Sequence, residues 1–302
     1  MKRRNTAASV KQRLLDLSRK SGEDFQQILS RYVIERLLLR LSKSGHDDSF
    51  ILKGAMLFAL WTGELLRPTR DLDLLGFGEE TPERLLGVFS EICRVKVSDD
   101  GLEFLVDTIA VEAIRPGQEY GGQRVKLTAT LGQARISVQI DIGFGDAITP
   151  MANKVEFPTL LGMESPSLRA YPKETVIAEK LEAIVQLGFA NTRMKDFYDL
   201  FIMSRMFPFE GDLLQTAVKN TFTRRATVLP NEIPVGLTVE FSVDEGRQKQ
   251  WAAFLNRSGI RGEKRLSDVV ASLRLFLVPL LNSAAKDQRF EALWSPQEGW
   301  RT

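Results

Sequence analysis

The chain has 302 residues, 43% of them apolar, and its 41 basic and 39 acidic residues leave a net charge of +2. This is enough apolar material for one large globular domain or two ordinary ones, and the near-neutral balance gives no overall field that would indicate nucleic-acid binding. One cysteine excludes an internal disulfide framework. With one cysteine and one histidine, the chain lacks the usual ligands of a structural zinc site. The single histidine, His46, lies in a Ser/Gly/Asp-rich loop, which argues against a Ser-His-Asp triad and a Cys-His catalytic pair.

The first elements expected in chain order are two helices. Apolar residues recur at helical spacing over residues 8–44 and are interrupted at SGED, where Ser21 or Gly22 is expected to cap the second helix. The N-terminal segment MKRRNTAASVKQRLLDLSRK is locally basic and could contact phosphate groups, although a solvated helix face accounts for the same pattern. The chain starts with the charged segment MKRRN. No apolar segment follows it and no eighteen apolar residues run together, so we expect a cytoplasmic protein that does not bind a membrane.

The next segment, FILKGAMLFALWTG, predicts a short strand, a tight turn at Lys53 and Gly54, and an apolar helix. The run DLDLLGF predicts a second strand. A helix should then begin with Thr81 as its cap and Pro82 at its first position. Three alternating stretches between residues 102 and 144 predict antiparallel strands, with PGQEYGG as one of the turns.

The second half of the chain has a mainly helical pattern from about residue 172 onward. The segment MESPSLRAYP carries prolines and serines and is a candidate linker. We therefore expect two domains, residues 1–165 and residues 166–302.

Two aspartates with a single residue between them occur in RPTRDLDLLGFG. Residues two apart in a strand share a face, so Asp71 and Asp73 should lie side by side. Asp141 adds a third carboxylate in the apolar run QIDIGF, where an unpaired charge would be costly. Such an oxygen-rich site suits Mg²⁺. The alternatives are a strand-edge pair neutralised by Arg67 and Arg70, and a buried ion pair at Asp141.

These motifs together resemble the polymerase-β-type nucleotidyltransferases and, more closely, the AbiEii/AbiGii toxin family. KG before a helix, RDLDLL and QIDIGF are similar to the family's glycine turn, DxD and third-carboxylate elements, and AEKLEAIVQL followed by RMKDFYDLF resembles its two later motifs. The likeness spans roughly residues 25–201. It implies an α+β protein: a nucleotidyltransferase domain with a mixed sheet and flanking helices over residues 1–165, then a mainly helical domain over residues 166–302 that closes the nucleotide cleft.

The function that the resemblance implies is that of a metal-dependent toxin from a toxin–antitoxin or phage-defence pair. Such an enzyme would transfer a nucleoside monophosphate from an NTP to RNA, with the tRNA 3′ end as the expected acceptor, and its antitoxin would be encoded nearby. The implied cofactor is Mg²⁺, with two ions when the NTP is bound. Two alternatives stay open: transfer to a protein side chain, and a non-catalytic nucleotide-binding interaction module.

The resemblance also assigns roles to individual residues. The implied catalytic residues are Asp71, Asp73, Asp141, Lys180 and Asp196, and the first three of them would bind the metal. The implied nucleotide-binding residues are Lys53, Gly54, Thr69, Arg70 and Lys180. The sequence departs from the family's pattern at KGAM, because Ala55 and Met56 replace the second glycine and the hydroxyl residue that many members have.

The two later motifs leave other readings open. Lys180 would hold the triphosphate as a compact cation, but a surface salt bridge with Glu179 or Glu182 is a rival explanation. Asp196 is the expected acidic motif residue, whereas Asp199 is expected only to favour the helix dipole. The basic pair in FTRRATVLP is a candidate contact to RNA phosphates.

Overall fold

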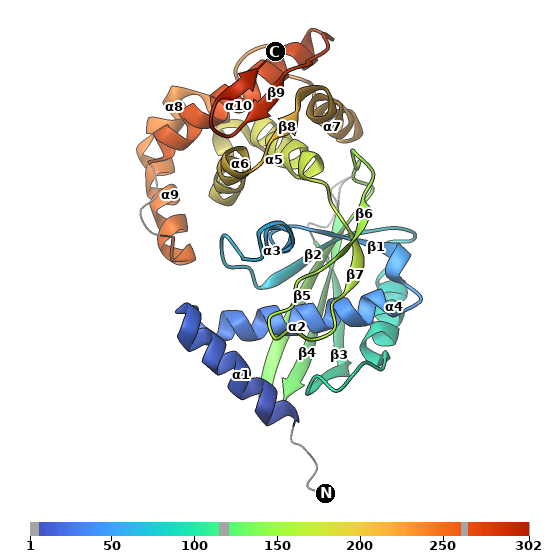
Figure 1. Cartoon of the computed structure of the whole chain (residues 1–302). Helices are drawn as coiled ribbons and strands as arrows, with labels where there is room; N and C mark the ends of the chain where they lie inside the picture. Colours follow the sequence, from blue (N-terminus) through green and yellow to red (C-terminus); the bar gives the residue numbers. More distant parts are fainter. Residues whose placement is uncertain (1–5, 115–120, 261–264, 302) are drawn as a thin grey trace, which may run out of the picture. The chain divides into compact units, whose positions relative to one another are not determined.

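The computed structural model describes residues 6–114, 121–260 and 265–301, and the chain forms two compact units (Figure 1). Unit 1 comprises residues 1–145 and 152–171, and unit 2 comprises residues 146–151 and 172–302. The segment MESPSLRAYP, expected to be a linker, contributes a strand to unit 1. The start MKRRN and most of the PGQEYGG turn lie outside the described residues.

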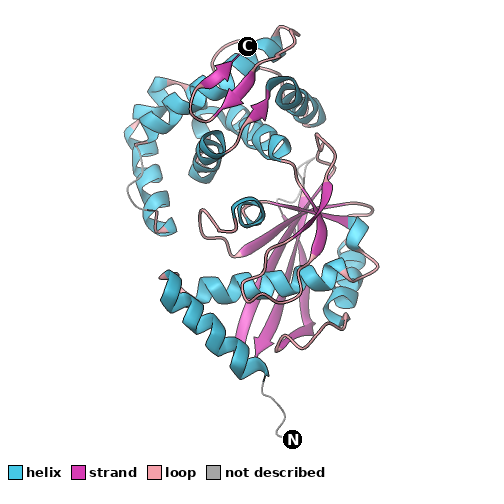
Figure 2. Cartoon of the chain, in the orientation of Figure 1, coloured by secondary structure: helices cyan, strands magenta, loops and turns pink. Residues whose placement is uncertain are grey.

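Unit 1 places helices around a seven-stranded sheet (Figure 2). Its elements are α1 (Thr6–Ser21), α2 (Phe25–Ser42), η1 (Asp47–Ser49), β1 (Phe50–Lys53), α3 (Met56–Thr62), β2 (Asp71–Gly76), α4 (Pro82–Arg94), β3 (Leu102–Ile114), β4 (Gly122–Leu131), β5 (Ala134–Phe144), β6 (Asn153–Glu156) and β7 (Ser167–Ala170).

The strand order of this sheet is β3-β4-β5-β2-β1-β7-β6. Strands β3, β4 and β5 pair antiparallel, as the alternating stretches predict, whereas β2 pairs parallel with β5 and β1 pairs parallel with β7. The predicted α+β fold with a mixed sheet is therefore confirmed. Because β2 is an interior strand, its two aspartates are not on a sheet edge.

The local signals at the helix ends are met with one exception. Thr81 caps α4 by accepting a hydrogen bond from the Arg84 amide, and Pro82 is its first residue. The expected cap of α2 at Ser21 or Gly22 is wrong: the Asp24 carboxylate caps α2 by accepting from the Gln27 amide. Ser21 is the last residue of α1 instead, and Gly22 follows it in the left-handed region at φ +76°.

The two faces of β2 have different surroundings. Leu72 and Leu74 are each only 1% exposed, whereas Asp71 and Asp73 lie on the opposite face and are partly exposed. Helices α2 and α4 pack against the sheet and enclose the core of unit 1. The sheet therefore buries the leucines and leaves the carboxylates on a face that solvent can reach.

Unit 2 is mainly helical and also contains a small sheet that the sequence pattern did not predict, of order β10-β9-β8. Its elements are α5 (Lys173–Leu187), η2 (Gly188–Ala190), α6 (Met194–Met206), β8 (Phe209–Glu210), α7 (Gly211–Arg224), η3 (Val235–Leu237), α8 (Val239–Val243), α9 (Glu245–Ser258), α10 (Leu266–Ala285), β9 (Leu293–Ser295) and β10 (Gly299–Arg301).

Helix α10 is long and apolar enough to cross a membrane by length and composition alone. Its buried residues include Leu273, Phe276 and Leu280, and it packs against α6, α7 and α8. The indole nitrogen of Trp300 also donates to the Phe276 carbonyl over 2.8 Å. These contacts are typical of the central helix of a helical domain.

Candidate functional site

A row of charged side chains crosses the sheet of unit 1. The strand registers pair Arg124 with Asp141, Asp141 with Asp73, and Asp73 with Lys53. Registered residues on neighbouring strands project from the same face, so these four side chains lie in one line. Asp71 stands on the same face, two residues before Asp73. The parallel β2–β5 pairing thus brings together the three aspartates that the sequence singled out.

The turn after β1 brings the backbone against one of these carboxylates. Gly54 has φ +75°, and a Cβ added to it would lie 1.9 Å from Asp73 Oδ2. Only glycine fits there, because any side chain would collide with the carboxylate and would also strain the backbone. Beside it, Lys53 Nζ lies 5.1 Å from the ring centroid of Tyr171, a cation–π contact.

Asp141 is paired with an arginine that the sequence did not single out. Arg124 Nε donates to Asp141 Oδ1 and Arg124 Nη2 donates to Asp141 Oδ2, each over 2.8 Å. The hydrogen bond to Asp141 raises the pKa of the Arg124 guanidinium above its ordinary value, and the charges of Asp141, Asp71 and Glu112 act in the same direction. Only the strand register reveals this pair, because its members are seventeen residues apart.

The two remaining residues of the predicted nucleotide site lie just before β2. The Thr69 hydroxyl donates to the Asp71 carbonyl over 3.1 Å, which fixes the entry into the strand. Arg70 is exposed. Thr69 therefore has a structural contact already, and the predicted contact of either residue with a nucleotide stays a prediction.

The three aspartates supply the right kind of donor for a hard divalent cation, because carboxylate oxygens are what Mg²⁺ prefers. Among the residues that the structure describes, no three His, Cys, Asp or Glu side chains are arranged to hold a metal ion as they stand. Both oxygens of Asp141 accept from Arg124 instead. Carboxylates of this kind suit a divalent cation, and the Asp141 carboxylate is already paired with Arg124.

Lys180 lies in unit 2, where α5 meets α6. Its Nζ is 2.9 Å from Asp196 Oδ1 and 2.8 Å from Asp199 Oδ2. The lysine side chain is 14% exposed, whereas the two aspartates are 0% and 1% exposed. Asp199, expected to serve only the helix dipole, is thus an equal partner of the lysine.

A second cation completes this cluster, since Arg193 Nε lies 2.6 Å from Asp196 Oδ2. Burial alone would raise the pKa of Asp196, but the charges of Lys180 and Arg193 together hold it below the ordinary value. Asp196 is therefore a buried anion stabilised by two cations.

The two glutamates beside Lys180 have a different partner. Arg225 Nη1 lies 2.8 Å from Glu182 Oε2, and its Nη2 lies 2.9 Å from Asp146 Oδ1 and 3.6 Å from Glu179 Oε1. Lys180 itself pairs with Asp196 and Asp199, two partners that the predicted surface pair with Glu179 or Glu182 did not include. Arg225 lies among three carboxylates, which weakens the expectation that it contacts RNA.

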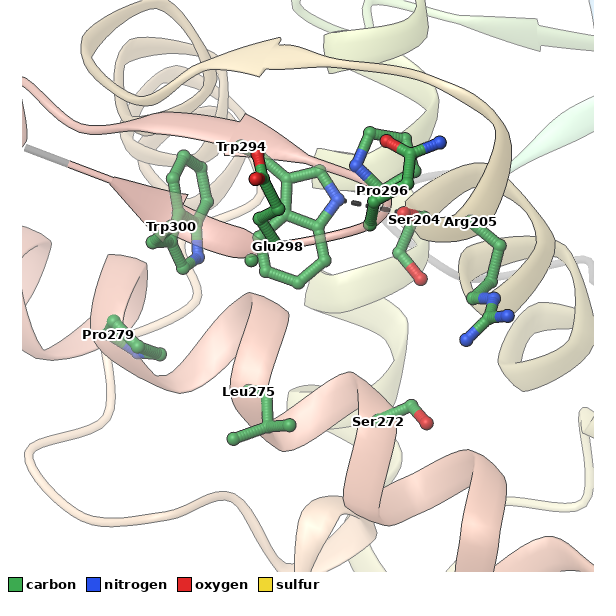
Figure 3. A pocket seen from close by; sticks show the side chains of 11 residues that line it. Ser204, Arg205, Ser272, Leu275, Pro279, Trp294, Pro296, Glu298 and Trp300 are labelled. Carbon is green, nitrogen blue, oxygen red and sulfur yellow. Dashed lines mark hydrogen bonds between the residues drawn. The ribbon is translucent and has the colours of Figure 1, made fainter.

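Unit 2 also contains a cavity of about 470 Å³ beside α10 and the β9–β10 hairpin (Figure 3). The Trp294 indole projects into it, and its nitrogen donates to the Ser204 carbonyl over 2.7 Å. The lining residues are Ser204, Arg205, Ser272, Leu275, Pro279, Trp294, Pro296, Gln297, Glu298, Gly299 and Trp300. None of the predicted site residues is among them.

Solved structures share this fold. A crystal structure of a candidate nucleotidyltransferase from Helicobacter pylori matches with a TM-score of 0.52 and 15% identity, over 87% of this chain and 98% of that one. A crystal structure of JHP933 from Helicobacter pylori matches with the same score and identity, over 87% of this chain and 95% of that one. No curated protein sequence matches the chain. The chain therefore shares the overall fold of these two structures.

The particular family follows from the family model that the chain matches. The model described as "Nucleotidyl transferase AbiEii toxin, Type IV TA system" matches residues 36–272. The chain belongs to this AbiEii family. It is a nucleotidyltransferase of a family of toxins from type IV toxin–antitoxin systems, as its motifs predict.

Proposed function

We propose that the protein transfers a nucleoside monophosphate from an NTP to RNA, with the 3′ end of tRNA as acceptor, in a reaction that needs a divalent cation. The observation that carries the proposal is the pairing of Asp73 with Asp141 on adjacent parallel strands, against the backbone of Gly54. Two carboxylates with a glycine turn beside them suit a metal-bound triphosphate, which needs anionic ligands for the cation and close approach of backbone amides.

The residues of unit 1 have distinct parts in this proposal. Asp71, Asp73 and Asp141 would hold Mg²⁺, which when bound neutralises charge on the leaving pyrophosphate and favours ionisation of the attacking hydroxyl. Gly54 lets the main chain reach a phosphate without a side chain in the way. Lys53, at the end of β1 and in register with Asp73, adds a positive charge next to that position.

The proposed part of Lys180 is to contact the triphosphate. Its two buried aspartate partners, Asp196 and Asp199, fix where the ammonium group points. In this proposal Asp196 acts through the lysine. Lysine commonly binds phosphate alongside a metal ion, because the compact charge of its ammonium group is strongly attracted to anions.

The family supports a proposal about the cellular setting. Membership in a toxin–antitoxin family means that the toxin has an antitoxin partner. We propose that the antitoxin is encoded nearby, that the pair acts in phage defence, and that the toxin works in the cytoplasm on RNA.

The test is a transfer assay with purified protein, Mg²⁺, each of the four α-labelled NTPs in turn, and total tRNA. Wild type should label the RNA, and the Asp71→Asn/Asp73→Asn double variant should label it at least about a hundredfold more slowly, because the metal contributes several kcal/mol to such reactions. Glu112→Gln is the matched control: this exposed carboxylate lies in the same row of the sheet, next to Arg124. It should keep nearly full activity.

The sensitivity of the labelled product to ribonuclease and to protease identifies the acceptor. Loss of label after ribonuclease treatment supports the RNA acceptor. A product that survives ribonuclease but not protease contradicts it and indicates a protein side chain instead. Equal labelling by wild type and the double variant would contradict the proposed roles of Asp71 and Asp73.

A further inference from the structure

The pairing of Arg124 with Asp141 bears directly on how the proposed metal site is loaded. Both oxygens of the carboxylate accept from the guanidinium, each over 2.8 Å. Two-point pairs of this kind are among the stronger ion pairs in proteins. The side chains are 31% and 23% exposed, so solvent screens the pair only in part. Asp141 is thus held by a cation that belongs to the protein itself.

The row of charges explains why a cation is needed there. Asp73 and Asp141 are registered neighbours, and like charges in such positions repel each other. Arg124 stands beside Asp141 and Lys53 stands beside Asp73, so each end of the anionic pair meets a positive charge. In a protein without bound metal, these two residues offset the repulsion that a divalent cation would otherwise remove.

The same contact sets a condition on metal binding. A cation shared by Asp73 and Asp141 needs at least one Asp141 oxygen, and both oxygens are hydrogen-bonded to Arg124. In the part of the chain that the structure describes, no group of three His, Cys, Asp or Glu side chains is placed to hold a metal ion. Mg²⁺ demands a nearly octahedral set of ligands, so the carboxylate must turn toward it. The guanidinium and the cation would therefore act on the same carboxylate, and the position of Arg124 limits how Asp141 can present an oxygen to the cation.

We propose that Arg124 is an internal competitor of the divalent cation, which holds Asp141 in the metal-free protein and releases it when the cation binds. This inference rests on the proposed metal site and deepens it, because it makes Arg124 the positioning residue that sets how much free cation the site needs. Removing the guanidinium should then strengthen metal binding. If Arg124 only kept Asp141 in a productive orientation, removing it would weaken metal binding instead.

The test is calorimetric titration of the full chain with Mn²⁺ and no nucleotide. Arg124→Met should lower the Kd for Mn²⁺ roughly tenfold, since it removes a strong two-point competitor. Arg124→Lys should give an intermediate Kd, because an ammonium group cannot bind both carboxylate oxygens in the same way. In an Asp141→Asn background, Arg124→Met should have no such effect, because the shared carboxylate is gone.

Lys126 supplies the matched control. It lies two residues from Arg124 on β4, on the same face, and its Nζ is 2.6 Å from Glu112 Oε1. Lys126→Met removes the same charge from the same strand without removing a partner of Asp141. It should change the Kd by less than about twofold, because a half-exposed charge is well screened.

Three results would overturn the inference. The first is an unchanged or weaker affinity of Arg124→Met for Mn²⁺, which would contradict the role of Arg124 as a competitor. In that case, loss of Mn²⁺ binding in Asp71→Asn/Asp73→Asn would still support the metal site itself. Equal tightening by Lys126→Met would show a general effect of charge. Absence of Mn²⁺ binding in wild type and all variants would overturn the metal site as well. Thermal melting checks the fold of each variant, and Arg124→Lys carries the test if Arg124→Met does not fold.

Discussion

The residue with the least freedom in the proposed site is Gly54. Its positive φ and the 1.9 Å separation between an added Cβ and Asp73 Oδ2 are separate constraints, and both exclude a side chain. Gly54 therefore suits the site because it has no side chain. The family-like motif predicts this glycine, but the reason for it, the carboxylate of a neighbouring strand, is visible only in the fold.

Gly54→Ala should lower stability and nucleotide transfer together. The left-handed backbone alone costs an alanine about 1–2 kcal/mol, and the collision with Asp73 adds to this and displaces the carboxylate. Gly63→Ala is the control, since Gly63 has φ +81° but no atom within 4 Å of an added Cβ. Urea unfolding should show a smaller loss of stability in Gly63→Ala than in Gly54→Ala, and the transfer assay should show lost transfer only in Gly54→Ala. Full activity of Gly54→Ala would contradict the proposed role of the turn.

At the scale of elements, one lysine links α5 to α6 through two ion pairs. Lys180 comes from α5, and Asp196 and Asp199 come from α6, all three with little or no exposure. Breaking a buried ion pair from one side leaves uncompensated charge, which is more costly than never having formed the pair. The cluster is therefore a structural joint of unit 2, whatever its part in catalysis.

Lys180→Met should destabilise the protein by about 3–5 kcal/mol, because two buried carboxylates lose their shared cation. Lys195→Met, an exposed lysine on the same α6, should change the free energy of unfolding by less than about 0.5 kcal/mol. Chemical denaturation of the two variants measures the difference. Equal stability of the two variants would mean that the ion pairs of Lys180 do not stabilise the contact between α5 and α6.

The elements themselves were largely predictable, because their signals are local. Helical spacing predicted α1 and α2, and Thr81 with Pro82 predicted the start of α4. The cap of α2 was misplaced at Ser21 or Gly22, since several residues of SGED can serve as caps and only the chain's path selects Asp24. The strands β8, β9 and β10 were missed because segments of two or three residues are too short to show a period.

At the scale of the whole molecule, we expect the folded protein to lose stability at acidic pH as Asp196 becomes protonated. The pKa of this buried carboxylate is lowered from 3.8 in the folded protein, so its ionised form is the one that folding stabilises. That contribution is fully present above the unfolded pKa and is lost as the pH falls through the folded pKa. We expect the melting temperature to fall as the pH decreases from about 5 toward 3.

The variant that checks this is Asp196→Asn, which should be less stable at pH 7 but should lose less stability than wild type on acidification. Glu35 of unit 1 acts in the opposite direction, because burial raises its pKa and so favours the folded protein at low pH. Melting curves of wild type and Asp196→Asn between pH 7 and pH 3 separate the two effects. Parallel curves would contradict the assignment to Asp196.

The sequence by itself determined the order of the motifs, the shared face of Asp71 and Asp73, and the membership of the family, because spacing along one strand and motif order are properties of the chain alone. The tertiary structure decided which side chains meet. Arg124 reaches Asp141, and Asp199 joins Asp196 at Lys180, through strand register and helix packing. Register depends on every pairing in the sheet at once, so no local pattern could place these partners.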